Sequence, residues 1–304
     1  MELVHVRQVP FEDLSQERID VLMFACSGTM DVNAILPTFL VPARRKIILA
    51  FCNDPISNSA FPNDAEIIYF RNDDDISEIH QALENLCQTY KGDNIKLVID
   101  YTFMQKRVLG AIVSFLSINE FTCNRLTVYF YCAETPVNFQ QSSETVLRPI
   151  LLYENYKFNK RPIALIVELN SMSQIEHVKE LYYTFCPVQA HFFIPSPILN
   201  QKDIESLEKF PASKVVGYIP HDLEMLDETL RQLCRQLRLD HRVVVVTMGS
   251  KIFSMVAFLI NARYPDVEVW QYDVATFTGN WAEGKGEKFV YRAILSDDFL
   301  EDIN

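Results

Sequence analysis

The fold of this chain is decided by a stretch that occurs twice: LENLCQTYKGDNIKLVIDYTFMQKRVLGAIVSFL at residues 83–116, and LRQLCRQLRLDHRVVVVTMGSKIFSMVAFLI at residues 230–260. Each copy reads as the end of a helix, a buried strand, a loop and the beginning of the next helix. Two copies are too few for a solenoid, which needs at least three stacked repeats. The pattern therefore predicts a duplicated α/β domain.

The repeat extends outward from both copies. The order strand, helix, strand, strand, helix, strand, helix, strand recurs at an offset of roughly 140–150 residues, which is a usual domain size. Pro55 and Pro197 each follow a second strand, and Cys87 and Cys234 fall at the same place in the helix before the fourth strand. The strands are continuous apolar runs such as KIILAF and RVVVVT, typical of parallel sheets covered on both faces. We therefore predict an α/β protein of two tandem Rossmann-like domains with mainly parallel sheets.

We place the first domain at residues 1–140, a polar linker at 141–160 and the second domain at 161–304. The tail after Asp273, TFTGNWAEGKGEKFVYRAIL, reads as a strand, a glycine-rich turn and a strand. It is expected to form a C-terminal β hairpin at a sheet edge or an arm that reaches the other domain. Good N-cap residues precede three of the expected helices: Asp75, Ser173 and Asp222.

Composition narrows the class of protein. Hydrophobic residues make up 49% and charged residues 22% of the chain, which are ordinary globular values. A formal net charge of −12 argues against broad, charge-driven binding of nucleic acid. No apolar run approaches the roughly 18 residues that span a membrane, and no secretory signal is visible. The seven scattered cysteines fit a reducing compartment, so we expect a cytoplasmic protein. The cysteines and histidines lack ligand spacing, and we expect no metal and no cofactor.

Open α/β sheets bind ligands beyond the carboxyl ends of their strands, where the strand order reverses. The candidate ligand-binding residues are those of the loops at this point: Ser27, Gly28, Thr29, Thr102, Arg107, Thr247, Gly249, Ser250 and Lys251. Glycine permits close approach of backbone N–H groups, and a helix N-terminus favours an anion. We expect Gly28 and Gly249 at cleft floors near unpaired N–H groups, with Lys251 or Arg107 as counter-charge. The alternative is that both glycines serve tight turns and both basic side chains are solvated.

Specific catalytic motifs are missing. The chain has no GxGxxG, no GxxxxGK[ST] and no GxSxG sequence, which argues against classical dinucleotide binding, P-loop hydrolysis and an α/β-hydrolase elbow. Asp100, at the end of a buried strand, is a candidate general base or metal carboxylate, although a turn or capping acid is the commoner role. Cys26 is a candidate nucleophile at a helix N-terminus, although a buried apolar cysteine is the commoner case. His191 fits a core histidine better than a base.

The residues VVVVTMGSK and the apolar helix after them resemble the last strand–loop–helix unit of CARF-type Rossmann sensor domains, whose loop reads close to TGGTK. The resemblance covers about 30 residues, and Met248 replaces the first glycine of that loop. It implies binding of cyclic oligonucleotides or related second messengers across a pair of Rossmann units, in prokaryotic antiviral defence. We expect no appended nuclease, winged-helix or membrane effector of the kind that many such proteins carry.

Three functions follow from these observations. The first is a ligand-sensing or regulatory subunit that binds a nucleotide-like anion at the switch-point loops. The second is a non-catalytic interaction subunit of a multi-protein complex, with a protein partner or a homo-oligomeric contact. The third, which we favour less, is an enzyme acting on a nucleotide or phosphate ester through Asp100 or Cys26.

Overall fold

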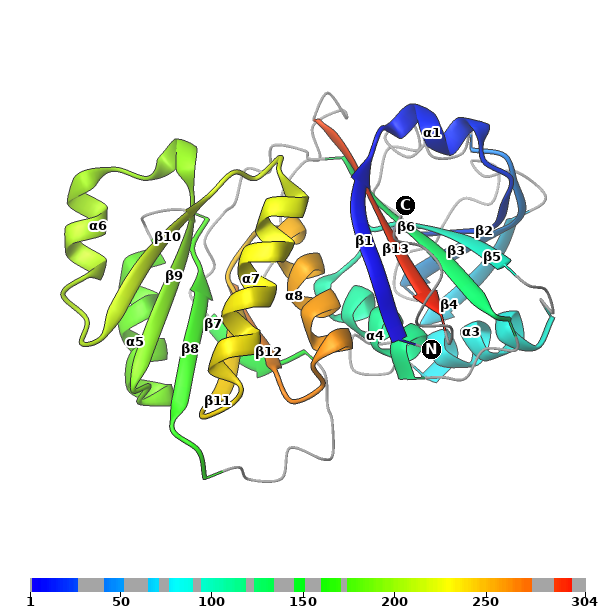
Figure 1. Ribbon diagram of the computed structural model, residues 1–304. Helices are drawn as coiled ribbons and strands as arrows, with labels where there is room; N and C mark the ends of the chain where they lie inside the picture. Colours follow the sequence, from blue (N-terminus) through cyan, green and yellow to red (C-terminus); the bar gives the residue numbers. More distant parts are fainter. Residues whose placement is uncertain are drawn as a thin grey trace. The chain divides into compact units, whose positions relative to one another are not determined.

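The computed structural model describes residues 2–26, 41–51, 65–70, 77–89, 94–118, 123–133, 145–150, 160–170, 174–274 and 287–296. The chain forms two compact units. Unit 1 contains Met1–Gln140 together with Phe277–Asn304, and unit 2 contains Gln141–Thr276. Figure 1 shows the elements of each unit.

Unit 1 is built on a seven-stranded sheet, sheet A, in the order β1-β13-β6-β5-β2-β3-β4. Its elements are β1 (Glu2–Val9), α1 (Phe11–Gln16), β2 (Ile19–Cys26), β3 (Ala43–Phe51), β4 (Ala65–Phe70), α3 (Ser77–Thr89), β5 (Asn94–Asp100), α4 (Lys106–Ile118), β6 (Arg125–Ala133) and β13 (Lys288–Ser296). The five strands from β6 to β4 are parallel, and β13 is antiparallel to both β6 and β1. Helix α1 lies on one face of sheet A, and α3 and α4 lie on the other (Figure 1).

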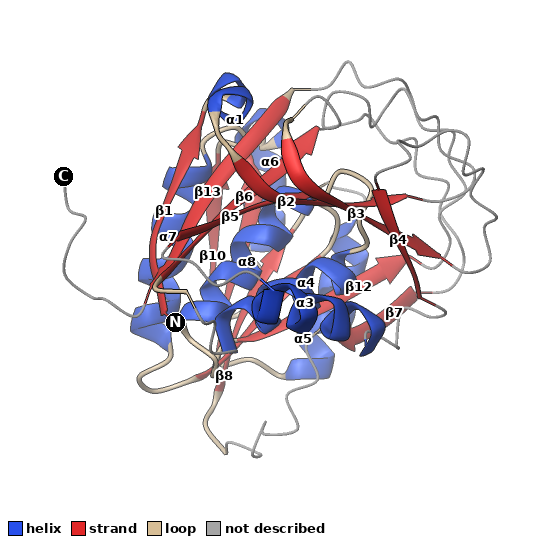
Figure 2. Ribbon diagram, turned by 90° about the vertical axis from the view of Figure 1, so that its right-hand side faces the viewer, coloured by secondary structure: helices blue, strands red, loops and turns tan. Residues whose placement is uncertain are grey.

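Unit 2 is built on a six-stranded sheet, sheet B, in the order β10-β9-β8-β11-β12-β7. Its elements are β7 (Thr145–Pro149), β8 (Ile163–Glu168), α5 (Ile175–Phe185), β9 (Gln189–Pro195), η4 (Ser196–Ile198), α6 (Gln201–Leu207), β10 (Ser213–Tyr218), α7 (Leu223–Leu237), β11 (Arg242–Thr247), α8 (Lys251–Arg263) and β12 (Glu268–Val274). All neighbouring strands are parallel except β7, which is antiparallel to β12. Figure 2 distinguishes the strands and helices by colour.

The two sheets share one topology, which confirms the tandem Rossmann-like α/β fold. In each unit the five parallel strands lie in the order third, second, first, fourth, fifth, with the strand order reversing between the first and the fourth. Strands β6, β8 and β11 are buried at every residue after the first, because helices cover both faces of each sheet. The continuous apolar runs in the sequence are the direct record of this two-sided burial.

Alternation along the strands of sheet B separates two packing layers. Leu165, Val167, Val244 and Val246 point to the face covered by α5 and α6, in a core that also includes Val178 of α5. The residues between them point to the opposite face. There, the ring of Phe253 in α8 packs against the rings of Phe193 and Tyr218, with centroid distances of 5.5 and 6.0 Å. Sheet B is therefore packed on both faces.

The expected domain boundaries need two corrections. Residues 145–149, placed in the linker, form β7 of sheet B, since they pair with Val274–Trp270 of β12. Residues 288–296, placed in the second domain, form β13 of sheet A, since they pair with both β6 and β1. The C-terminal tail is thus an arm to the first unit. The first strand of the expected hairpin, residues 276–281, lies outside the described residues.

The structure also bears on the expected helix caps, cysteines, membrane spans and metal sites. Asp222 caps α7, where its Oδ1 accepts a hydrogen bond of 2.9 Å from Met225 N, while Asp75 and Ser173 lie outside the described residues. Cys123, Cys132, Cys186 and Cys234 are free thiols. Among the described helices, none combines the length and apolar character needed to cross a membrane. Among the described residues, no three His, Cys, Asp or Glu side chains gather as a metal site.

His191 in β9 is a core histidine. It is 5% exposed, and its Nε2 has no hydrogen-bond partner in the structure. Burial disfavours the imidazolium, and Lys214, its neighbour on β10, repels it; together they lower the pKa of His191 to about 4 from 6.5. Below pH 6.5 this histidine is therefore protonated in the unfolded chain, whereas in the folded chain it stays neutral until about pH 4.

We predict that His191 makes the protein lose stability as the pH falls from 6.5 towards 4, at up to about 1.4 kcal/mol per pH unit. His191→Phe, which keeps a ring and cannot titrate, should flatten the free energy of unfolding across this window. Urea unfolding at several pH values measures it. Equal slopes for wild type and His191→Phe would contradict the assignment.

Candidate functional site

A fully buried carboxylate stands at the switch point of unit 2. Glu168 is the last residue of β8 and is 0% exposed. Its partners across the sheet are Thr247 on β11 and Phe193 on β9. Since Leu165 and Val167 point to the α5 face, Glu168 points to the α8 face. The carboxylate thus lies where β8 ends and α8 begins.

The carboxylate of Glu168 accepts hydrogen bonds from three consecutive backbone N–H groups of the β11–α8 loop. Its Oε2 accepts from Met248 N at 3.0 Å and from Gly249 N at 3.1 Å, and its Oε1 accepts from Ser250 N at 3.2 Å. A helix N-terminus presents such N–H groups, with a partial positive charge, to an anion. Glu168 therefore fills the anion-binding position of α8 from inside the protein.

This arrangement corrects one expectation and explains a glycine. The N–H of Gly249 is not unpaired, because Glu168 accepts from it. A Cβ at position 249 would lie 3.0 Å from Cβ of Asn170, which is tighter than most Cβ contacts and would require Asn170 to shift by a few tenths of an ångström. The φ of Gly249 is not positive. Glycine at this position lets the loop after β8 pass close to the loop after β11.

Gln174 joins these two loops. Its Oε1 accepts from Asn170 N at 2.8 Å, and its Nε2 donates to Met248 O at 2.9 Å. One side chain therefore holds the backbone of both crossovers immediately before α5 begins. Together, Glu168 and Gln174 fix the β11–α8 loop through four of its backbone groups.

The other predicted residues of this loop take different places. Ser250 caps α8, since its Oγ accepts from Phe253 N at 3.1 Å. Lys251 is the first residue of α8 and is half-buried. Thr247 is 0% exposed, and no group in the described part of the chain forms a hydrogen bond with its hydroxyl. An unsatisfied hydroxyl thus lies in register with Glu168, on the same face of sheet B.

In unit 1 the corresponding crossover is tied by different groups. Asp100 ends β5, is 4% exposed, and accepts from Thr102 N at 2.9 Å. The hydroxyl of Thr102 in turn accepts from Ala133 N, at the end of β6, at 2.9 Å. Asp100 is thus a turn acid and Thr102 a buried bridge between strand ends, while Arg107 is a half-buried residue of the first turn of α4. This geometry gives Asp100 and Thr102 structural roles.

The remaining predicted site residues cannot be placed. Ser27, Gly28 and Thr29, and the side chain of Cys26, lie outside the described residues. The described candidates fall into two groups, one in each unit: Thr102 and Arg107 with Asp100, and Thr247, Gly249, Ser250 and Lys251 with Glu168.

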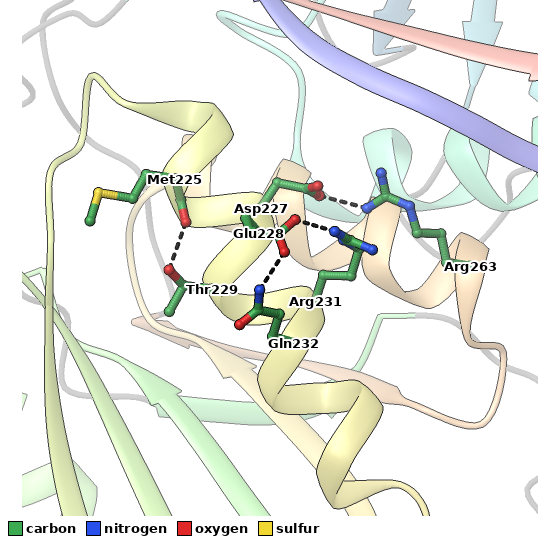
Figure 3. Close-up of polar contacts among 7 residues, drawn as sticks. All are labelled: Met225, Asp227, Glu228, Thr229, Arg231, Gln232 and Arg263. Carbon is green, nitrogen blue, oxygen red and sulfur yellow. Dashed lines mark hydrogen bonds and ion pairs between the residues drawn. The ribbon is translucent and has the colours of Figure 1, made fainter. Parts of the chain in front are cut away.

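A polar cluster ties α7 to α8 (Figure 3). Asp227 of α7 and Arg263 of α8 form an ion pair at 2.7 Å, with side chains only 6% and 13% exposed. Burial raises the pKa of Asp227, and the attraction of Arg263 opposes that rise. On the exposed side of α7, Glu228 accepts from Arg231 and Gln232 (Figure 3). The Asp227–Arg263 pair therefore links α7 to α8, the helix that follows the β11–α8 loop.

Sequence reasoning missed Glu168 and Gln174. The available signal was a single acidic residue that closes the otherwise apolar strand RPIALIVEL at a switch point. Charged residues are rarely fully buried unless they are paired, so a buried acid at that position implied hydrogen-bond donors nearby. The backbone N–H groups of the glycine loop after β11 are those donors. For Gln174 no signal was available, since its role depends on the approach of two loops distant in sequence.

No family model matches the chain, and no curated protein matches its sequence. Among solved structures, the chain is similar to a short chain dehydrogenase from Leptospira borgpetersenii serovar Hardjo-bovis with bound NAD+. The TM-score is 0.22 at 13% identity, over 83% of this chain and 82% of that chain. The Rossmann-like fold assignment stands on the strand order of the two sheets.

Replacing threonine by valine should change the free energy of unfolding in opposite directions at the two crossovers. Thr247→Val removes a buried hydroxyl that lacks a partner and should raise the free energy of unfolding by about 1 kcal/mol. Thr102→Val leaves the buried N–H of Ala133 without its acceptor and should lower it by about 1–3 kcal/mol. Urea unfolding compares both with wild type. The assignment fails if Thr247→Val is the more destabilising of the two.

Proposed function

We propose that the chain is a non-catalytic regulatory subunit that senses a nucleotide-like anion at the β8–β11 switch point of unit 2. The observation that carries the proposal is the carboxylate of Glu168, which sits on three N–H groups of the β11–α8 loop as an anionic ligand would. In this proposal Glu168 is a built-in surrogate for the ligand. It keeps the loop satisfied while the ligand is absent.

A phosphate group can compete with Glu168 for the same donors. Near pH 7 a terminal phosphate carries up to two negative charges and three strong acceptor oxygens, against one charge and two oxygens for a carboxylate. Lys251, in the first turn of α8, adds positive charge beside the loop. The hydroxyl of Thr247, buried without a partner, supplies a further donor or acceptor at the base of the site.

Exchange of Glu168 for a ligand would be transmitted through Gln174. Displacing the carboxylate shifts Met248 and Gly249, whose backbone groups Glu168 holds. Gln174 bonds to Met248 O and lies directly before α5, so the shift would reach this helix. The proposal therefore names two states of one loop, with the ligand and Glu168 as competing occupants.

Isothermal titration with inorganic phosphate, adenosine nucleotides and cyclic oligoadenylates tests the proposal. Glu168→Gln keeps the side-chain shape but removes the competing charge, so it should bind the active ligand at least about tenfold more tightly than wild type. Lys251→Ala should bind at least about tenfold more weakly, because it loses the counter-charge.

The matched control is Glu176→Gln, an exposed glutamate of α5, which should bind as wild type does. Absence of binding to all of these ligands by wild type, Glu168→Gln and Lys251→Ala would contradict the sensor proposal. Equal affinities for wild type and Glu168→Gln would contradict the competition between Glu168 and the ligand.

A second candidate function is a protein-interaction subunit, favoured by apolar side chains at the carboxyl end of sheet B. Ile198 follows β9, Ile219 follows β10, and Met225 lies in the first turn of α7; they are 37%, 48% and 55% exposed. Because β9 and β10 are parallel neighbours, Ile198 and Ile219 both lie beyond the carboxyl ends of the strands. Exposed apolar groups of this kind are common in protein contacts. This function gains support if the ligand panel gives no binding.

A further inference from the structure

We infer that the two halves of the chain exchange their last strands, so that the protein is an interlocked pair of repeats. In sequence, β7 follows β6, the fifth parallel strand of sheet A, yet β7 pairs with β12 of sheet B. Likewise, β13 follows β12, the fifth parallel strand of sheet B, yet β13 pairs with β6 of sheet A. Each sheet is completed by the strand that follows the other. The inference is independent of any ligand.

The exchanged strands are equivalent by position and by sequence. Both lie antiparallel to the fifth strand of their sheet. Residues 134–144 precede β7 and residues 275–287 precede β13, so both strands follow connections of similar length. The two segments also share the pattern V-x-R-x-I-L, formed by Val146, Arg148, Ile150 and Leu151 in one and by Val290, Arg292, Ile294 and Leu295 in the other. They are copies of one ancestral sixth strand.

The exchange is most extensive in sheet A. There β13 is an interior strand that pairs along its length with β6 on one side and β1 on the other. Tyr291 and Ala293 are 0% exposed and Val290 is 1% exposed. Without β13, strand β1 would lose its pairing partner and β6 would present an open edge. The N-terminal half therefore completes its own sheet only with a strand from the C-terminal half.

A cut between β7 and β8 would therefore leave the halves joined. The N-terminal fragment would still insert β7 into sheet B, and the C-terminal fragment would still insert β13 into sheet A. In an arrangement without exchange, the same cut would produce two fragments with complete sheets. The position of the cut separates the repeats in sequence but not in structure.

The test inserts a specific protease site within residues 151–159 of the full chain, which is folded, cleaved and passed through a sizing column in native buffer. We expect both fragments to elute together at the size of the uncut chain and to separate after denaturation in urea. Elution as two separate folded fragments in native buffer would overturn the inference.

Engineered cysteine pairs distinguish strand exchange from ordinary association of two fragments. Ala133 and Lys288 are direct partners on β6 and β13, so Ala133→Cys with Lys288→Cys should form a disulfide. After cleavage, this bond would join the fragments on a non-reducing gel. The control pair, Val274→Cys with Lys288→Cys, tests the pairing of β12 with β13 that an arrangement without exchange would make, whereas in this structure β12 pairs with β7. A mapped 274–288 bond in place of the 133–288 bond would overturn the inference.

Discussion

The carboxylate of Glu168, held by three backbone N–H groups, is the interaction on which the crossover of unit 2 depends. A carboxylate taken out of water loses several kcal/mol of solvation unless donors replace the water. The N-terminus of α8 supplies those donors, and the carboxylate in turn satisfies groups that a helix leaves unbonded. The close approach of Asn170 to Gly249 and the bridge through Gln174 both require the loop conformation that this exchange of hydrogen bonds fixes.

In both repeats a buried acid accepts hydrogen bonds from backbone N–H groups beyond a strand end, but the acid and its donors differ. In unit 1, Asp100 and Thr102 tie the turn after β5 and the end of β6. In unit 2, the acid comes from the first parallel strand instead of the fourth, and it occupies the start of the following helix. The carboxylate of Glu168 thus accepts from the N-terminus of α8, whereas that of Asp100 accepts from a backbone N–H within its own turn. The two copies therefore differ in which backbone groups their buried acids satisfy.

Most of the architecture could be predicted from local pattern, because a parallel strand buried on both faces leaves a continuous apolar run such as RVVVVT or IALIVE. The sheet that the last strand joins could not be predicted in this way. Residues 288–296 read correctly as a strand, but hydrophobic pattern does not specify which sheet accepts it. The glycine loop does lie at the carboxyl end of β11, but the expectation that its N–H groups are unpaired was wrong, because Glu168 accepts from them. That fact depends on Glu168 and Gly249 meeting across 81 residues of chain.

The central claim is that Glu168 holds the N–H groups of the β11–α8 loop, and amide hydrogen exchange measured by NMR tests it most directly. In wild type the amides of Met248, Gly249 and Ser250 should be protected. In Glu168→Gln, whose side chain lacks the charge, all three should exchange at least about tenfold faster, while amides of β9 keep their rates. Unchanged exchange at these three amides in Glu168→Gln would contradict the account.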